Sequence, residues 1–157
     1  MGYKEYEVGG KANSRPAMWG FQAEGAAPLV RGHVVPNPET IATAIRIGNP
    51  ASWDLAVDAI KSSGGLIDMV TDDEILSAYR ILSSREGVFV EPSSAAGVAG
   101  LIKKKNAGEL PTNKRIVITV TGHGLKDVQW ALEGNAAATP VVIPVDVKAA
   151  AKELNLS

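Results

Sequence analysis

Short apolar runs alternate with helical patterns along this chain, and this alternation strongly restricts the folds it can adopt. The runs lie at residues 18–23, 66–70, 87–91 and 115–120. Apolar residues at helical spacing occupy most of the chain between them. Because alternating strands and helices are typical of parallel sheets with helical crossovers, we predict an α/β fold with a mostly parallel sheet and helices on both faces.

Start and stop signals predict where the helices lie. Thr71-Asp72-Asp73-Glu74 has the Thr-x-x-Glu form of a capping box, so a helix is expected to begin there. Residues 1–6 show no recognisable element, as though the chain began within a larger fold. The other helices are predicted at residues 24–30, 38–47, 52–62, 95–105 and 146–154, with a short one after Asp127.

The composition excludes several classes of function. A formal net charge of -1 leaves no basic stripe for nucleic acid or an anionic membrane. The absence of cysteine excludes a thiolate metal site, and with only His33 and His123 a histidine-rich metal cluster is excluded as well, so no metal is expected. No apolar run approaches membrane-spanning length and the N-terminus has no signal-peptide layout, so a cytoplasmic protein is expected.

A threonine and two glycines follow the apolar run at 115–120. The stretch is Thr121-Gly122-His123-Gly124-Leu125-Lys126-Asp127. The Thr121 hydroxyl suits a weakly basic ring nitrogen or a phosphate oxygen, and glycines able to take positive φ would let a planar ligand approach the backbone. The alternative is that Thr121 bonds a loop carbonyl and the glycines only make a turn.

Glu91 is the second candidate, at the end of the preceding predicted strand. Ligands bind beyond the carboxyl ends of parallel strands, so Glu91 and Thr121 could face one crevice. The alternative is structural: Ser93 or Ser94 caps the following helix, and Glu91 pairs with a nearby cation. For His123 we expect a loop or solvent position rather than a general base. Lys103-Lys104-Lys105 is expected to be a solvated cluster that suits the helix dipole.

Four stretches together resemble the threonine synthase family, within fold type II (the β family) of pyridoxal-phosphate enzymes. The order and spacing match from about Gly2 to Asp127. The second and fourth stretches are fairly specific to that family, whereas the third is shared with dehydratases. The stretches are Met18-Trp19-Gly20-Phe21-Gln22, residues 44–53 (AIRIGNPASW), residues 90–96 (VEPSSAA) and residues 121–127 (TGHGLKD).

The resemblance implies a site for pyridoxal 5'-phosphate. The residue matching Thr121 hydrogen-bonds the pyridine nitrogen, and a neutral hydroxyl does not favour a fully protonated ring. Glu91 matches, more loosely, a carboxylate close to the cofactor. The family's Schiff-base lysine, substrate-phosphate site and cofactor-phosphate loop match nothing here. Lys126 belongs to another motif, so no catalytic residue is assigned in this chain.

The resemblance also implies an activity and a domain assignment. Residues 1–157 are expected to be the C-terminal part of the catalytic domain, with no second domain. Together with an N-terminal half, and as a homodimer, they would act as a lyase in threonine biosynthesis, converting O-phospho-L-homoserine and water to L-threonine and phosphate. The chain alone is expected to be inactive. Two alternatives stay open: a threonine or serine dehydratase fragment, and a non-catalytic α/β domain that binds a ligand or partner.

Overall fold

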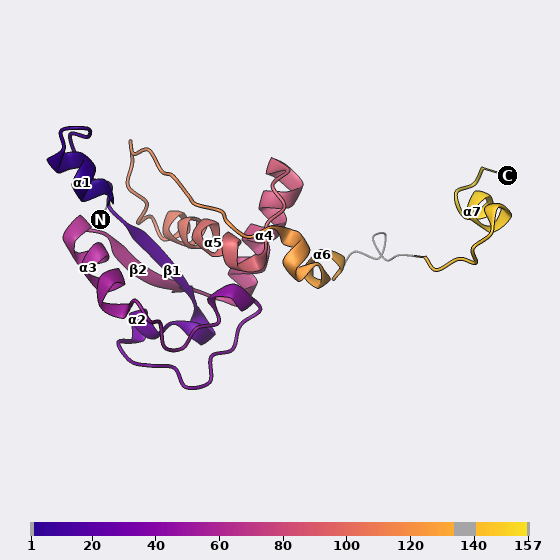
Figure 1. Ribbon diagram of the computed structural model, residues 1–157, viewed down its shortest axis with the longest axis horizontal. Coiled ribbons are helices and arrows are strands. Elements are labelled where there is room, and N and C mark those ends of the chain that lie inside the picture. The colour runs from indigo at the N-terminus through magenta and orange to yellow at the C-terminus, as the bar shows by residue number, and fades with distance from the viewer. Residues whose placement is uncertain (1, 134–140, 157) are drawn as a thin grey trace. The chain divides into compact units, whose positions relative to one another are not determined.

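The computed structural model describes residues 2–133 and 141–156 (Figure 1). The chain divides into two compact units, Met1–Asp127 and Val128–Ser157. The assignment of one domain over the whole chain stays a prediction. The first unit contains, in order, α1 (Gly2–Val8), β1 (Trp19–Ala23), η1 (Glu24–Ala26), α2 (Pro28–Arg31), η2 (Thr43–Ile45), α3 (Trp53–Ser63), β2 (Leu66–Val70), α4 (Asp72–Glu86), α5 (Pro92–Asn106) and η3 (Gly124–Asp127).

The sheet of the first unit consists of the first two predicted strands. β1 and β2 run parallel, with Trp19 opposite Leu66 and Ala23 opposite Val70 (Figure 1). The predicted bounds of these strands, 18–23 and 66–70, are confirmed to within one residue. The crossover between them contains α2, η2 and α3.

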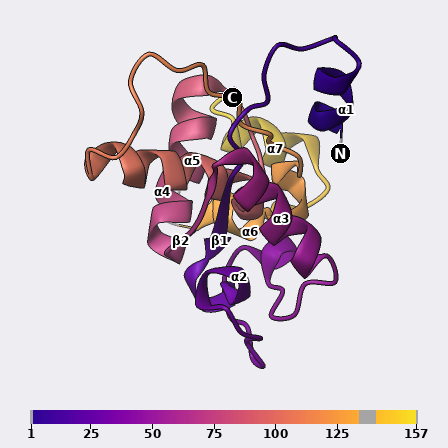
Figure 2. The same cartoon turned by 90° about the vertical axis from the view of Figure 1, so that its left-hand side faces the viewer.

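Helices lie on both faces of this sheet, as predicted. Side chains alternate between the faces of a strand, so Phe21 and Gln22 of β1 point in opposite directions. On the Phe21 face, α5 packs so closely that a Cβ added to Gly100 would lie 2.2 Å from the Phe21 ring. On the other face, Gln22 Oε1 accepts the backbone N–H groups of Leu29 and Val30, at the start of α2. Figure 2 shows this arrangement from a second direction.

α4 begins with the capping box that the sequence predicts. The Glu74 N–H donates to Thr71 Oγ1 (3.2 Å), and the Thr71 N–H donates back to Glu74 Oε2 (2.8 Å). The helix ends at Gly87, which takes a φ of 67° in the left-handed region. α4 then packs along α5, and Ile75 and Ala78 of α4 are fully buried.

Of the three lysines predicted as a solvated cluster at the end of α5, Lys105 is exposed, but Lys103 and Lys104 pair with Asp68. Lys104 lies 2.8 Å from Asp68 of β2 and 2.7 Å from Glu109, and its side chain is 15% exposed. Burial raises the pKa of Asp68, but hydrogen bonds from Lys104 and the Met69 N–H, with the charges of Lys103 and Lys104, outweigh it and lower that pKa overall. The ion pairs therefore fasten α5 to β2.

The helix predicted at 38–47 is wrong, because only the single turn η2 forms there. Asp72, at the start of α4, accepts the Thr40 hydroxyl and the Ile41 N–H. The Arg46 guanidinium donates twice to the Thr40 carbonyl, so that oxygen is not left for a helical N–H. One side chain within the segment, Arg46, and one distant in the sequence, Asp72, thus compete with the helix for its backbone groups.

The strands predicted at 87–91 and 115–120 are also wrong. The first makes an isolated antiparallel bridge between Val90 and His123, and the second has no regular structure. Neither segment is paired with a strand in the described chain, and a strand needs a neighbour to pair with. By contrast, the first residues, for which no element was recognised, form α1.

The second unit contains two helices, α6 (Gln129–Leu132) and α7 (Val147–Glu153). Asp146 caps α7 by accepting the Ala149 N–H at 2.9 Å, as is usual for an aspartate in that position. Both helices lie where the sequence predicts them. Within residues 2–133 and 141–156, no helix combines the length and apolar character that crossing a bilayer requires.

Candidate functional site

Two segments that contain the predicted site residues lie side by side. The Glu91 N–H donates to the Gly122 carbonyl (2.9 Å), and the Gly124 N–H donates to the Phe89 carbonyl (3.2 Å). These bonds flank the bridge between Val90 and His123. Residues 89–91 therefore run antiparallel to residues 122–124, which differs from the adjacent parallel strands that were predicted.

The glycines of this loop are required for close approach. A Cβ added to Gly122 would lie 1.8 Å from Glu91 Oε1, and one added to Gly124 would lie 2.5 Å from the Phe89 ring. Neither glycine is among those with positive φ, so the freedom to take that conformation, noted from the sequence, is not used here. The missing side chains let the loop backbone rest directly on Glu91 and Phe89.

Glu91 is buried and paired with a lysine. Glu91 is 4% exposed. Its Oε2 lies 3.3 Å from the ammonium of Lys126, a side chain that is itself largely exposed. Pairing with a nearby cation is the structural alternative raised from the sequence. The carboxylate therefore lies beneath the loop rather than opening to solvent, and its proximity to a cofactor stays a prediction.

Thr121, in contrast, is exposed and lies beside the first turn of α5. Its Oγ1 is 3.3 Å from Ser94 Oγ. Ser94 Oγ also accepts the backbone N–H groups of Thr121 (3.3 Å) and Gly122 (2.8 Å). The serine predicted as a helix cap thus binds the loop instead, since the N-cap of α5 is Glu91 and makes no side-chain cap.

A third segment, the turn η2, joins this cluster. Asp127 is 8% exposed and its Oδ2 accepts the Thr43 hydroxyl at 3.1 Å, while Ser93 Oγ accepts the Ala44 N–H at 3.1 Å. Ser93 therefore does not cap α5 either. The pairing of Thr43 with Asp127, which lie 84 positions apart, was not predicted from the sequence. In the sequence, the one indication that Asp127 belongs to the site is its position at the end of the 121–127 motif.

Aromatic rings lie next to the loop. Phe89 packs edge-on against His123, with centroids 5.6 Å apart, and is tilted against Tyr79 at 6.2 Å. His123 is exposed, and its Nδ1 lies 3.2 Å from the Leu125 N–H, consistent with the predicted loop position. Burial, together with the negative charge of Asp127, raises the pKa of Tyr79.

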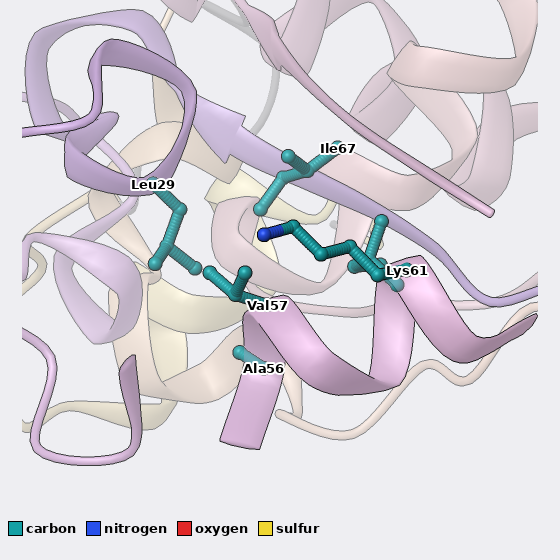
Figure 3. A pocket seen from close by; sticks show the side chains of 6 residues that line it. Leu29, Ala56, Val57, Lys61 and Ile67 are labelled. Atoms are coloured by element: carbon teal, nitrogen blue, oxygen red, sulfur yellow. The ribbon is translucent and has the colours of Figure 1, made fainter. Parts of the chain in front are cut away.

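A separate pocket lies on the other face of the sheet, between α2, α3 and β2 (Figure 3). Its volume is about 200 Å³, and the ammonium of Lys61 reaches over an otherwise apolar lining. None of the predicted site residues lines it. The lining residues are Leu29, Ala56, Val57, Ile60, Lys61 and Ile67. Among the described residues, no cluster of three or more His, Cys, Asp or Glu could hold a metal ion.

Comparison with known proteins identifies relatives of this chain. A family model described as "Pyridoxal-phosphate dependent enzyme" matches residues 1–122. The chain is 54% identical over 134 residues to a threonine synthase of Bacillus sp., covering 85% of this chain and 38% of the relative. It is 50% identical over 155 residues to that of Mycobacterium leprae, covering 99% and 42%. The chain thus spans about two-fifths of the length of these curated relatives.

Among solved structures, the chain is similar to a threonine deaminase from T.th. The TM-score is 0.48 and the sequence identity is 22%, with 63% of this chain and 40% of that chain covered.

Proposed function

This chain belongs to the family of pyridoxal-phosphate dependent enzymes, and from that premise we propose that it forms the ring-nitrogen side of a threonine synthase active site. One observation carries the proposal: three of the stretches that resemble threonine synthase meet around Thr121. Residues 121–127 bind Ser94 of the VEPSSAA stretch. The AIRIGNPASW stretch joins them through Ala44, whose N–H donates to Ser93 Oγ, and the preceding Thr43 donates to Asp127.

The residues near Thr121 fit one edge of pyridoxal phosphate. The Thr121 hydroxyl is exposed and neutral, which suits hydrogen bonding to a weakly basic ring nitrogen. Gly122 and Gly124 let the loop backbone lie directly on Glu91 and Phe89, which holds Thr121 in place beside the first turn of α5. When bound, the cofactor supplies an electron sink that stabilises negative charge on a substrate carbon. We assign Thr121 to the ring nitrogen.

We assign Glu91 a supporting position in the same site. Its carboxylate contacts the underside of Gly122 and pairs with Lys126, and both contacts restrain the loop that carries Thr121. This lysine is already engaged by Glu91 and belongs to the loop motif. We therefore propose that the lysine that binds the cofactor comes from the part of the relatives that this chain does not match.

The proposed reaction is that of a lyase acting on O-phospho-L-homoserine. The substrate and water give L-threonine and phosphate, in a homodimer whose subunits each combine this chain with the lysine-bearing part. A biosynthetic reaction of this kind fits a cytoplasmic location. The chain alone is proposed to be inactive, because one hydrogen bond from Thr121 contributes only about 1 kcal/mol net to binding.

Reconstitution tests this proposal. The 157-residue chain is mixed with the unmatched part of the Mycobacterium leprae threonine synthase and pyridoxal phosphate, and phosphate release from O-phospho-L-homoserine is measured. We expect turnover in the mixture and none with either part alone. Borohydride reduction and peptide mapping should place the cofactor on one lysine of the added part.

Three outcomes would contradict the proposal. Stoichiometric labelling of one lysine of this chain alone, with turnover, would place the catalytic lysine here. Ammonia release from threonine or serine by the mixture, without phosphate release, would favour a dehydratase. A mixture that binds no cofactor would favour a non-catalytic domain.

A further inference from the structure

We propose that Ser94 is a positioning residue that turns the proton of the Thr121 hydroxyl outward, so that the site selects a ligand atom that accepts a hydrogen bond. This inference rests on the proposed function, because it assigns the protonation state of the ring nitrogen that Thr121 would meet. It concerns Ser94, for which the sequence suggests only a helix cap.

The first step counts the hydrogen bonds of Ser94. A hydroxyl has one proton to donate and two lone pairs to accept with. Ser94 Oγ accepts from the Thr121 N–H at 3.3 Å and from the Gly122 N–H at 2.8 Å, so both lone pairs are engaged. In the described part of the chain, the oxygen within hydrogen-bond distance of its remaining proton is Thr121 Oγ1, at 3.3 Å.

The second step follows from the direction of that bond. If Ser94 donates to Thr121 Oγ1, the proton of Thr121 must point to another partner. Ser94 is 7% exposed and Thr121 is exposed, so the free proton is directed to the open side of the loop. An outward donor binds an unprotonated ring nitrogen and is mismatched with a protonated one, which is itself a donor.

The third step concerns rigidity. Ser94 lies in the first turn of α5, a 15-residue helix that packs on both strands and along α4. Glu91 restrains the same loop from below, through the close approach of Gly122. The direction of the Thr121 proton is therefore determined by a rigid helix, as a preorganised donor requires.

The hydrogen bonds from the Thr121 and Gly122 N–H groups to Ser94 Oγ can be tested without any cofactor. Amide hydrogen exchange of the 157-residue chain, followed by NMR, measures them. In Ser94→Ala, the Thr121 and Gly122 amides should exchange about three- to tenfold faster, the factor expected for one net hydrogen bond. Ser93→Ala is the matched control, since among the described residues Ser93 Oγ accepts the Ala44 N–H alone, and the substitution should leave both amides unchanged. Unchanged exchange in Ser94→Ala would overturn the inference.

The direction of the proton is tested on the reconstituted complex, with pyridoxal phosphate isotopically labelled at the ring nitrogen. In the unmodified complex and in Ser93→Ala, the nitrogen signal should be that of the unprotonated ring at neutral pH. In Ser94→Ala, Thr121 is free to accept, so the ring should become protonated at higher pH than before. A ring that is protonated in the unmodified complex, or an identical titration in Ser94→Ala, would overturn the inference.

Two further results keep the test decisive. If Ser94→Ala does not fold, Thr121→Val, which keeps the shape and removes the hydroxyl, should shift the ring titration in the same direction, and no shift would count against the proposal. If the nitrogen signal of the bound cofactor is unaffected by Thr121→Val while its phosphorus signal shifts, Thr121 binds phosphate oxygen and the inference is wrong. If the complex binds no cofactor, the proposed function fails. Amide exchange still shows whether Ser94 holds the Thr121 and Gly122 amides.

Discussion

At Gly122 the loop backbone lies within van der Waals distance of a buried carboxylate, and this contact determines which residue can stand there. The nearest atoms that an added Cβ would meet are Oε1, Cδ and Cγ of Glu91, at 1.8, 2.0 and 2.7 Å. Glu91 is buried and paired with Lys126, so it has little freedom to move away. The requirement is for space, not for an unusual backbone angle.

Gly122→Ala is therefore expected to lower the free energy of unfolding by about 1–3 kcal/mol, the usual effect of forcing extra atoms into a packed site. Urea denaturation of the 157-residue chain measures it. Gly20→Ala is the matched control, because a Cβ there would meet the Ile67 side chain at an ordinary 3.7 Å. Equal stability of the two variants would contradict this account of the loop.

A second residue-scale prediction concerns Asp68 and pH. Its pKa in the folded chain lies below its ordinary value of 3.8. The carboxylate therefore contributes stability that is complete above that value and is lost as the pH falls through the folded pKa. Asp68→Asn should be less stable than the unmodified chain at neutral pH, and the difference should shrink below about pH 4.

Urea denaturation at a series of pH values measures this difference. Asp58→Asn is the control, since Asp58 is an exposed carboxylate of α3 with no ion pair among the described residues. Its difference from the unmodified chain should be small at every pH. A constant difference for Asp68→Asn down to strongly acidic pH would show that its lysine pairs do not stabilise the fold.

At the scale of elements, α4 shows how local signals suffice for some helices. Thr71 and Glu74 exchange two hydrogen bonds within a single turn, and no distant residue is needed to form them. The helix then presents Ile75 and Ala78 to the core at helical spacing. Such an element is predictable because its start, period and end all lie within a few residues.

Thr71→Ala should remove the capping box and lower the free energy of unfolding by about 1 kcal/mol, within the usual range for lost caps. Thermal unfolding followed by circular dichroism measures it. Ser84→Ala, an exposed site on the same helix whose hydroxyl donates to the Arg80 carbonyl, should be close to neutral. If both variants unfold like the unmodified chain, the cap contributes nothing to stability.

At the scale of the whole molecule, exposed apolar residues in the 115–120 segment are the most consequential feature. Ile116, Ile118 and Val120 are 38–45% exposed, and Val117 is 84% exposed. These β-branched residues lie in an extended segment that has no strand partner in the described chain. Clustered apolar surface of this kind favours association.

We expect the isolated chain to self-associate at high concentration, and Val117→Lys to reduce the association in sedimentation velocity. Val8→Lys is the matched control, because Val8 is similarly exposed, at 81%, on α1 and away from this segment. A monodisperse monomer at high concentration would contradict the prediction, as would an equal effect of the two substitutions.

The sequence alone determined the elements whose signals are local. Both strands of the sheet, the capping box at Thr71, the helices α3 and α5 and the loop motif at Thr121 follow from patterns within a few residues. Tertiary structure decided the rest. Asp72 binds the Thr40 hydroxyl and the Ile41 N–H from more than 30 positions away, and residues 87–91 and 115–120 lacked a strand to pair with in the described chain. The bond from the Gly122 N–H to Ser94 Oγ and that from the Thr43 hydroxyl to Asp127 join residues 28 and 84 positions apart, and periodicity carries no information about such contacts.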